Sequence, residues 1–266
     1  GRVDADAGGI TMGDLMTTTS DTGSISYAAT TEVALNLVTS KSGALDVTAT
    51  AGAISDITAL ENANLVTAGT ATLMAATGIG AAAAADIDTT IGTLTATNLT
   101  SGDIYVQETS GLIIGGTGVR TLDGDGNINI DVDAGNLDVN SVVTANGSGM
   151  ITLNADAGTV DINAVVSSTT GNIDIDGDII TQDDDITTGG AGVVTVDADA
   201  GAITMADLMT TTSDTGSISY AATTDVALRL LTSTCGSLNV TATEGAISDI
   251  TALQNANLVT TVTSPL

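Results

Sequence analysis

Apolar and polar residues alternate along most of the chain, in short stretches that each begin with a glycine. The recurring pattern is Gly, any residue, apolar, any residue, apolar, as in GDIYV at 102, GNINI at 126, GTVDI at 158 and GNIDI at 171. Alternation with a period of two places every second side chain on the same face, which predicts short β-strands with one buried face. The glycine, often next to Asp, Asn, Ser or Thr, predicts a bend before each strand.

The spacing of these glycines indicates how the strands are arranged. Every second one follows the series 126, 149, 171, 192, 216 and 236, a period of 20 to 24 residues. The single Asn-Gly pair, at 146–147, lies in a longer loop, so tight hairpins between neighbouring strands are not expected. A strand, a bend, a second strand and a longer bend in each period predict an all-β fold, a parallel β-helix (β-solenoid) of about twelve coils.

One stretch departs from the alternation. The sequence AATGIGAAAAAD at 75–86 has no period of two, and a run of Ala favours helix. Because the run is short and follows glycine, we expect a tightly packed irregular coil here, with a brief helix as the lesser alternative.

A second, longer repeat spans the whole chain. Residues 3–67 align with residues 196–260 without a gap, and 54 of the 65 positions are identical. The differences include Asn36/Arg229, Lys41/Thr234, Ser42/Cys235, Asp46/Asn239, Ala51/Glu244 and Glu61/Gln254, whereas Ile10, Met12, Ile25, Val33, Leu35, Leu37, Leu45, Val47, Ile54 and Ile57 are unchanged. The variable charged residues are expected on the surface of the protein, and the unchanged apolar residues are expected in its core. We therefore expect one continuous solenoid over 1–266, lengthened by duplication of a unit of 193 residues and cut from a longer array.

Composition restricts the core and the partners. The chain has no Phe, Trp or His, yet 42% of its residues are hydrophobic, so small aliphatic side chains must fill a narrow interior. Its net charge of −28 would repel phosphate backbones and anionic lipid, which argues against nucleic acid and membrane surfaces as partners. No apolar run is long enough for a transmembrane helix, and Cys235, the single cysteine, can form no internal disulfide.

The same composition argues against catalysis. Without His there is no imidazole base and no serine triad of the usual kind, and the four basic residues are scattered. We expect no enzyme activity.

Calcium is the one cofactor that the sequence suggests. DGDGNINID at 123–131 brings Asp123, Asp125 and Asn127 together as an EF-hand loop would, but Ile128 and Ala134 stand where that loop needs Gly and Glu. These three residues are weak metal candidates. Threonine is abundant and suggests an ice-binding face, although no Thr-x-Thr motif recurs at a fixed place in each period. A calcium-binding or ice-binding module is therefore the alternative function.

One run of repeats resembles a known family. The sequence AGNLDVNSVVTANGSGMITLNADAGTVDINAVVSSTTGNIDIDGDI, at 134–179, is similar to the filamentous-haemagglutinin-like repeats of large bacterial surface and secreted adhesins. The resemblance implies that the β-helix is right-handed and that the protein is exported to the cell surface or medium. It also implies a structural shaft that serves attachment, biofilm or filament formation. Its expected partners are copies docked head to tail or neighbouring repeats of the same chain, together with an unknown ligand on other cells or surfaces.

Overall fold

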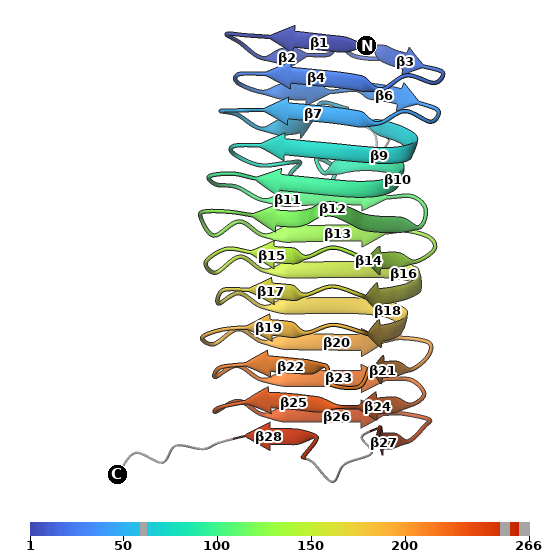
Figure 1. The fold of residues 1–266 in the computed structure, drawn as a ribbon, viewed down its shortest axis with the longest axis vertical. Helices are drawn as coiled ribbons and strands as arrows, with labels where there is room; N and C mark the ends of the chain where they lie inside the picture. Colours follow the sequence, from blue (N-terminus) through green and yellow to red (C-terminus); the bar gives the residue numbers. More distant parts are fainter. Residues whose placement is uncertain (59–62, 251–255, 261–266) are drawn as a thin grey trace.

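The computed structural model describes residues 1–58, 63–250 and 256–260, and it is a three-sided rod of parallel β-strands (Figure 1). Each turn of the chain passes over three faces, and each strand pairs in parallel with strands one turn away. The rod has about 11 turns, so at about 4.8 Å per turn it is about 50 Å long. No helix occurs among the described residues. The predicted all-β parallel solenoid is confirmed, with about 11 turns in place of the twelve expected.

The strands can be assigned to the faces from their pairing. Face 1 consists of β1 (Arg2–Ala5), β4 (Ile25–Ala29), β7 (Leu45–Ala49), β15 (Val143–Ala145), β17 (Val166–Ser168), β19 (Ile186–Thr188), β22 (Thr210–Ser213), β25 (Leu230–Ser233) and β28 (Leu258–Thr260). Face 2 consists of β2 (Ile10–Thr11), β5 (Val33–Leu35), β8 (Ile54–Asp56), β11 (Ile104–Glu108), β13 (Ile128–Val132), β20 (Val194–Ala198), β23 (Ile218–Ala222) and β26 (Leu238–Ala242).

Face 3 consists of β3 (Thr17–Ser20), β6 (Leu37–Ser40), β14 (Leu137–Val139), β21 (Ile203–Met205), β24 (Val226–Leu228) and β27 (Ile247–Asp249). Five longer strands bend from one face to the next: β9 (Leu65–Ala75), β10 (Ile87–Asn98), β12 (Leu112–Thr121), β16 (Ile151–Ile162) and β18 (Ile173–Gln182).

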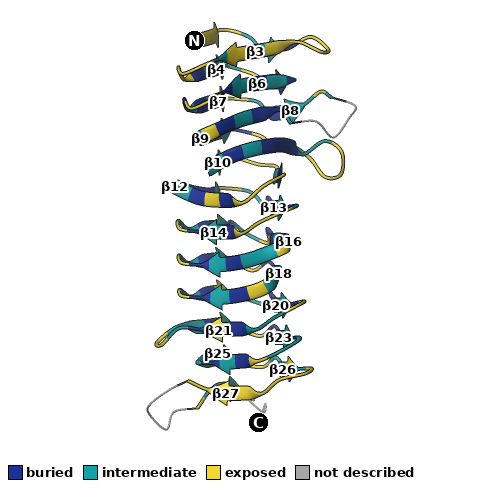
Figure 2. Ribbon diagram, turned by 90° about the vertical axis from the view of Figure 1, so that its right-hand side faces the viewer, coloured by how far each residue is buried: buried dark blue, intermediate teal, exposed yellow. Residues whose placement is uncertain are grey.

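The interior is filled by aliphatic columns. Alternate residues of each strand point inward, so that Leu153, Ile175 and Val196 stack in successive turns with at most 1% of their surface exposed. Figure 2 shows this alternation as buried and intermediate bands along the strands. The aromatic residues of the core are Tyr27 and Tyr220, and the hydroxyl of Tyr220 bonds Gln182 Oε1 (2.6 Å) and Thr211 Oγ1 (2.6 Å).

The corner before face 2 explains the glycine pattern. A Cβ at Gly171 would lie 2.0 Å from the carbonyl oxygen of Gly149, and the same clash recurs at Gly126, Gly149, Gly192, Gly216 and Gly236. A buried hydroxyl supports this corner from the end of face 1. Ser168 Oγ donates to Gly149 O (2.7 Å) and accepts from Gly171 N (2.9 Å). Ser213 and Ser233 make the equivalent pair of bonds in later turns.

The Ala-rich stretch forms an irregular coil, as predicted, and contains no helix. Ile79 lies in the core column between Ile54 and Ile104, and Ala81 and Ala85 form an antiparallel bridge around Ala83, which has a φ of 59°. Residues 81–84 of this stretch form an exposed loop before β10, seen to the right of β10 in Figure 2.

The two copies of the long repeat occupy different faces. Ile25 and its counterpart Ile218 have the same sequence surroundings, but Ile25 lies on face 1 and Ile218 on face 2. The column that contains Val33 runs through Ile54, Ile79, Ile104, Ile128, Ile151, Ile173 and Val194 to Ile218. Eight turns therefore separate Val33 from Ile218, whereas the sequence counterpart of Val33 is Val226 on face 3, so the second copy does not repeat the faces of the first.

Candidate interaction surfaces

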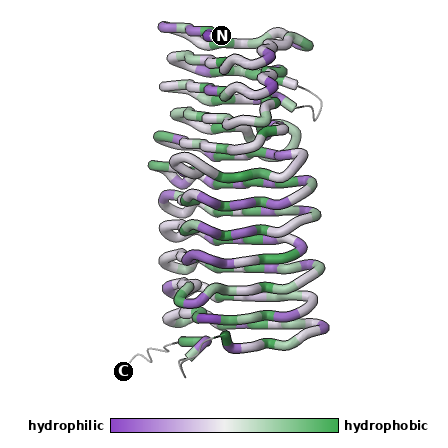
Figure 3. Tube along the Cα trace, turned by 45° about the vertical axis from the view of Figure 1, so that its right-hand side comes forward, coloured by the Kyte–Doolittle hydropathy of each residue, from purple (hydrophilic) through white to green (hydrophobic). Residues whose placement is uncertain are grey.

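Face 2 carries a ladder of carboxylates. Its outward column contains Gln107, Asp131, Asn154, Asp176 and Asp197 in successive turns. Asp174 points outward from the same strand as Asp176, and Figure 3 shows hydrophilic segments repeated on successive turns of this half of the rod. Side chains in neighbouring turns are about 5 Å apart, so these like charges interact along the rod axis.

Partial burial and the neighbouring charges of the ladder raise the pKa of its carboxyl groups. Partial burial, followed by the charges of Asp199, Asp197 and Asp174, raises the pKa of Asp176 to about 6. Burial is also the first cause of the raised pKa of Asp131 and Asp197, to which neighbouring carboxylates add. Asn154 interrupts the ladder and relieves it, because its amide donates to Asp131 Oδ1 (2.9 Å) and Asp156 Oδ1 (2.6 Å).

The predicted calcium residues lie on the corner between faces 1 and 2, where each bonds the backbone separately. Asp123 Oδ1 accepts from Gly124 N (2.8 Å), Asp125 Oδ1 from Ser148 N (2.8 Å) and Asn127 Oδ1 from Met150 N (2.9 Å). Among the residues that the structure describes, no group of three or more His, Cys, Asp or Glu side chains could hold a metal ion. Calcium binding at Asp123, Asp125 and Asn127 stays a prediction, and the bonds that the structure shows stabilise the corner.

Corner bonds of this kind account for many of the acidic and amide residues. Asp103 accepts from the backbone N–H of Asn127, Asn172 from that of Val193 and Asp225 from that of Ala246, in each case one turn further along. The Asp and Asn residues beside the glycines therefore join successive turns.

Face 1 carries a column of hydroxyls that the sequence pattern did not reveal. Thr144, Ser167, Thr187, Thr212 and Thr232 point outward in five successive turns. The column has one outward hydroxyl per turn, and no Thr-x-Thr motif recurs along it. The strands of face 1 are separated by 20 to 25 residues in sequence, and this variable spacing concealed the column.

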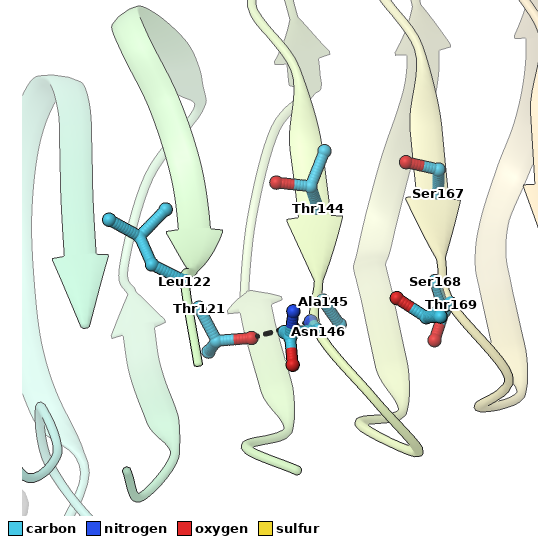
Figure 4. A pocket seen from close by; sticks show the side chains of 8 residues that line it. All are labelled: Thr121, Leu122, Thr144, Ala145, Asn146, Ser167, Ser168 and Thr169. Atoms are coloured by element: carbon cyan, nitrogen blue, oxygen red, sulfur yellow. Dashed lines mark hydrogen bonds between the residues drawn. The ribbon is translucent and has the colours of Figure 1, made fainter. Parts of the chain in front are cut away.

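A shallow groove crosses the start of this hydroxyl column (Figure 4). It is lined by Thr121, Leu122, Thr144, Ala145, Asn146, Ser167, Ser168 and Thr169. Thr121 Oγ1 accepts the backbone N–H of Asn146 (3.0 Å), so this hydroxyl links two turns. The groove therefore offers small polar groups and no charged side chain.

The two ends of the rod expose its cross-section. Ile247 and Leu258 in the last turn are 53% and 45% exposed, whereas their counterparts Ile54 and Leu65 in the first copy are 1% and 0% exposed. At the other end Val3 is 40% exposed, and its counterpart Val196 is 1% exposed. The same sequences are thus buried wherever another turn covers them.

One loop of the repeat is strained in both copies. Leu15 and Leu208 hold the equivalent position in the corner before β3 and β22, with φ of 59° and 73°, and they are 83% and 70% exposed. A left-handed backbone conformation is unfavourable for leucine, so both copies hold this corner in the same strained conformation.

No protein-family model, no curated protein and no solved structure matches this chain. Among the described residues, no helix is long and apolar enough to cross a membrane. The fold therefore defines the class, a parallel β-solenoid repeat protein.

Proposed function

We propose that this chain is a segment of the rigid shaft of a large extracellular or cell-surface bacterial fibre protein, with a structural role in attachment, biofilm or filament formation. The observation that carries the proposal is the continuity of the core columns through both copies of the duplicated unit. Copying this unit lengthens the rod. The adhesin-like style of the repeats at 134–179 supports the surface location.

The surfaces fit a shaft better than a catalyst. The acidic ladder, the hydroxyl column and the corner bonds all run along the rod over several turns, whereas an active site concentrates unlike groups in one place. The groove in Figure 4 is shallow and uncharged. We accordingly propose no enzymatic reaction.

The test combines location with architecture. Antibodies raised against the chain should label intact cells or shed fibres of the source bacterium, and the isolated fibres should give a meridional reflection near 4.8 Å. Labelling that appears only after lysis would contradict the surface location. Surface material without that reflection would contradict the stacked shaft.

The hydroxyl column favours ice binding as a second candidate function. Five stacked Thr or Ser hydroxyls form a regular array, but the outward column beside them is mixed and contains Val142, Val165, Asp185, Thr210 and Leu230. Thermal hysteresis that disappears in Thr187→Lys and persists in Thr204→Lys, on face 3, would support it. The absence of hysteresis in the unaltered protein would reject it.

A further inference from the structure

The corner that follows β15 holds the one Asn-Gly pair of the chain, Asn146 and Gly147. We propose that this pair is a site of spontaneous covalent modification, at which Asn146 deamidates through a cyclic imide formed with Gly147. The substrate is the chain itself and the co-reactant is water. The product is a carboxylate, carried on a backbone of normal or increased length. The inference goes beyond the proposed shaft function and does not depend on it.

The reaction starts when the backbone nitrogen of Gly147 loses its proton to a base in solution and attacks Cγ of Asn146. A bond forms between that nitrogen and Cγ, the bond between Cγ and Nδ2 breaks, and Nδ2 takes a proton from water and leaves as ammonia. Water then opens the imide ring at one of its two carbonyl carbons. Opening at Cγ gives aspartate. Opening at the backbone carbonyl carbon gives isoaspartate, whose main chain runs through the former side chain.

The attacking nitrogen has no competing hydrogen bond. The other N–H groups of this corner all have acceptors: Asn146 N donates to Thr121 Oγ1 (3.0 Å), Ser148 N to Asp125 Oδ1 (2.8 Å) and Gly149 N to Asn146 O (3.1 Å). Within residues 1–58, 63–250 and 256–260, no acceptor takes the N–H of Gly147. Gly147 has no side chain to hinder the attack, and its φ of 60° is one that residues with side chains rarely adopt.

The side-chain amide of Asn146 is also unrestrained. It is partly exposed in the groove shown in Figure 4, and it makes no side-chain hydrogen bond to any residue that the structure describes. Asn140, six residues earlier in the same turn, differs in this respect, because its Oδ1 accepts from Asn163 Nδ2 (3.0 Å). Cγ must rotate onto the following nitrogen for the imide to form, and a hydrogen bond of this kind opposes the rotation.

The product changes both the groove and the corner. The groove is lined by Thr144, Ser167 and other uncharged side chains, so a carboxylate at position 146 would be the first charge among them. Isoaspartate would add one atom to the main chain of a corner that supports the next turn. In that corner Gly147 O accepts from Thr170 N (2.8 Å) and from Thr170 Oγ1 (3.0 Å). Deamidation therefore marks the age of a rod and weakens a link between two turns.

The test is incubation of the intact folded protein at pH 8.5, followed by mass spectrometry of its peptides. The peptide that contains Asn146 should become about 1 Da heavier, and isoaspartyl methyltransferase should label it. The rate should fall at pH 6.5, because the attack requires the Gly147 nitrogen to lose its proton. The same incubation in urea is the positive control, since the unfolded chain reacts according to sequence alone. A folded protein that stays unmodified at Asn146 while the unfolded chain reacts would overturn the proposal.

Ser141→Gly separates the effect of the structure from that of the sequence. This variant gives Asn140 a glycine neighbour, while Asn163 Nδ2 still bonds the side chain of Asn140. In the folded variant Asn146 should react about five times faster than Asn140, the factor that corresponds to a hydrogen bond of about 1 kcal/mol. The two rates should converge in urea. Equal rates in the folded variant would refute the assignment of reactivity to this corner.

Asn146→Gln is the control for the position of the modification. Glutamine has one more methylene group, so the corresponding imide would need a six-membered ring, and the peptide should keep its mass during the incubation. A mass gain in this peptide that persists in Asn146→Gln would place the modification at another residue and would also overturn the proposal.

Discussion

Replacing Asp176 by Asn should stabilise the rod at neutral pH. The pKa of Asp176 is raised to about 6, so the folded state binds a proton more readily than the unfolded chain does. The stabilisation that protonation supplies is complete below the ordinary pKa of 3.8 and is lost as the pH rises through about 6. At pH 7.5 the ionised Asp176 therefore opposes folding, and an amide would remove this opposition.

The magnitude follows from the shift and from exposure. A shift of about two pKa units corresponds to about 3 kcal/mol at full strength. Asp176 is only partly buried, and solvent screening reduces this figure to about 1 kcal/mol. For a chain of this size, that is a rise in Tm of about 2–4 °C. Asn154, one turn earlier in the same column, shows that an amide fits there and can donate to neighbouring carboxylates.

The assay is thermal unfolding followed by circular dichroism at pH 7.5 and at pH 4.5. The gain from Asp176→Asn should be present at pH 7.5 and should shrink at pH 4.5, where Asp176 itself is protonated. Asp6→Asn removes one charge from an exposed loop outside the ladder and should have little effect at either pH. An equal gain from Asp176→Asn at both values would refute the reasoning, since the effect would then not depend on ionisation.

Three further substitutions test the corners and the buried Glu108. The effect of each is measured as the change in the free energy of unfolding in urea. Ser168→Ala leaves the Gly149 carbonyl and the Gly171 N–H without their hydroxyl partner and should destabilise the rod by about 1–3 kcal/mol, whereas Ser167→Ala, which points outward, should change little. Gly171→Ala places a Cβ 2.0 Å from the Gly149 carbonyl and should cost about 3 kcal/mol, whereas Gly8→Ala meets nothing within 4 Å. Glu108→Gln should cost about 1–3 kcal/mol, because one amide N–H₂ would face groups that donate to the carboxylate. Equal effects in a variant and its control would contradict the assigned contact.

Periodicity was sufficient to predict the fold because the core is built from one kind of contact. In every turn, Ile, Val or Leu side chains pack against those of the turn before it. The alternation of apolar and polar residues that identifies a strand therefore also identifies its inward residues. Ile130, Leu153 and Ile175 could each be assigned to the core from their place after a glycine. The glycine itself was assigned to a bend, and the clash that excludes a Cβ gives the physical reason.

Features that depend on contacts between turns could not be predicted in this way. Whether Thr187 stacks on Ser167 depends on how many residues each corner uses, and corners of different length change the spacing without changing the columns. Glu108 appeared as one of many acidic residues, and only the fold shows that it is buried with four hydrogen bonds from Thr89, Ile91 and Ser110. The placement of the two copies on different faces was likewise hidden, because identical sequences suggest identical positions.

The distribution of charge bears on how such rods can associate. Carboxylates lie on faces 2 and 3 and on the corners, as at Asp176, Asp161 and Asp214, so these surfaces of two rods repel each other. A net charge of −28, much of it on these surfaces, therefore limits the lateral aggregation that long β-rods would otherwise undergo.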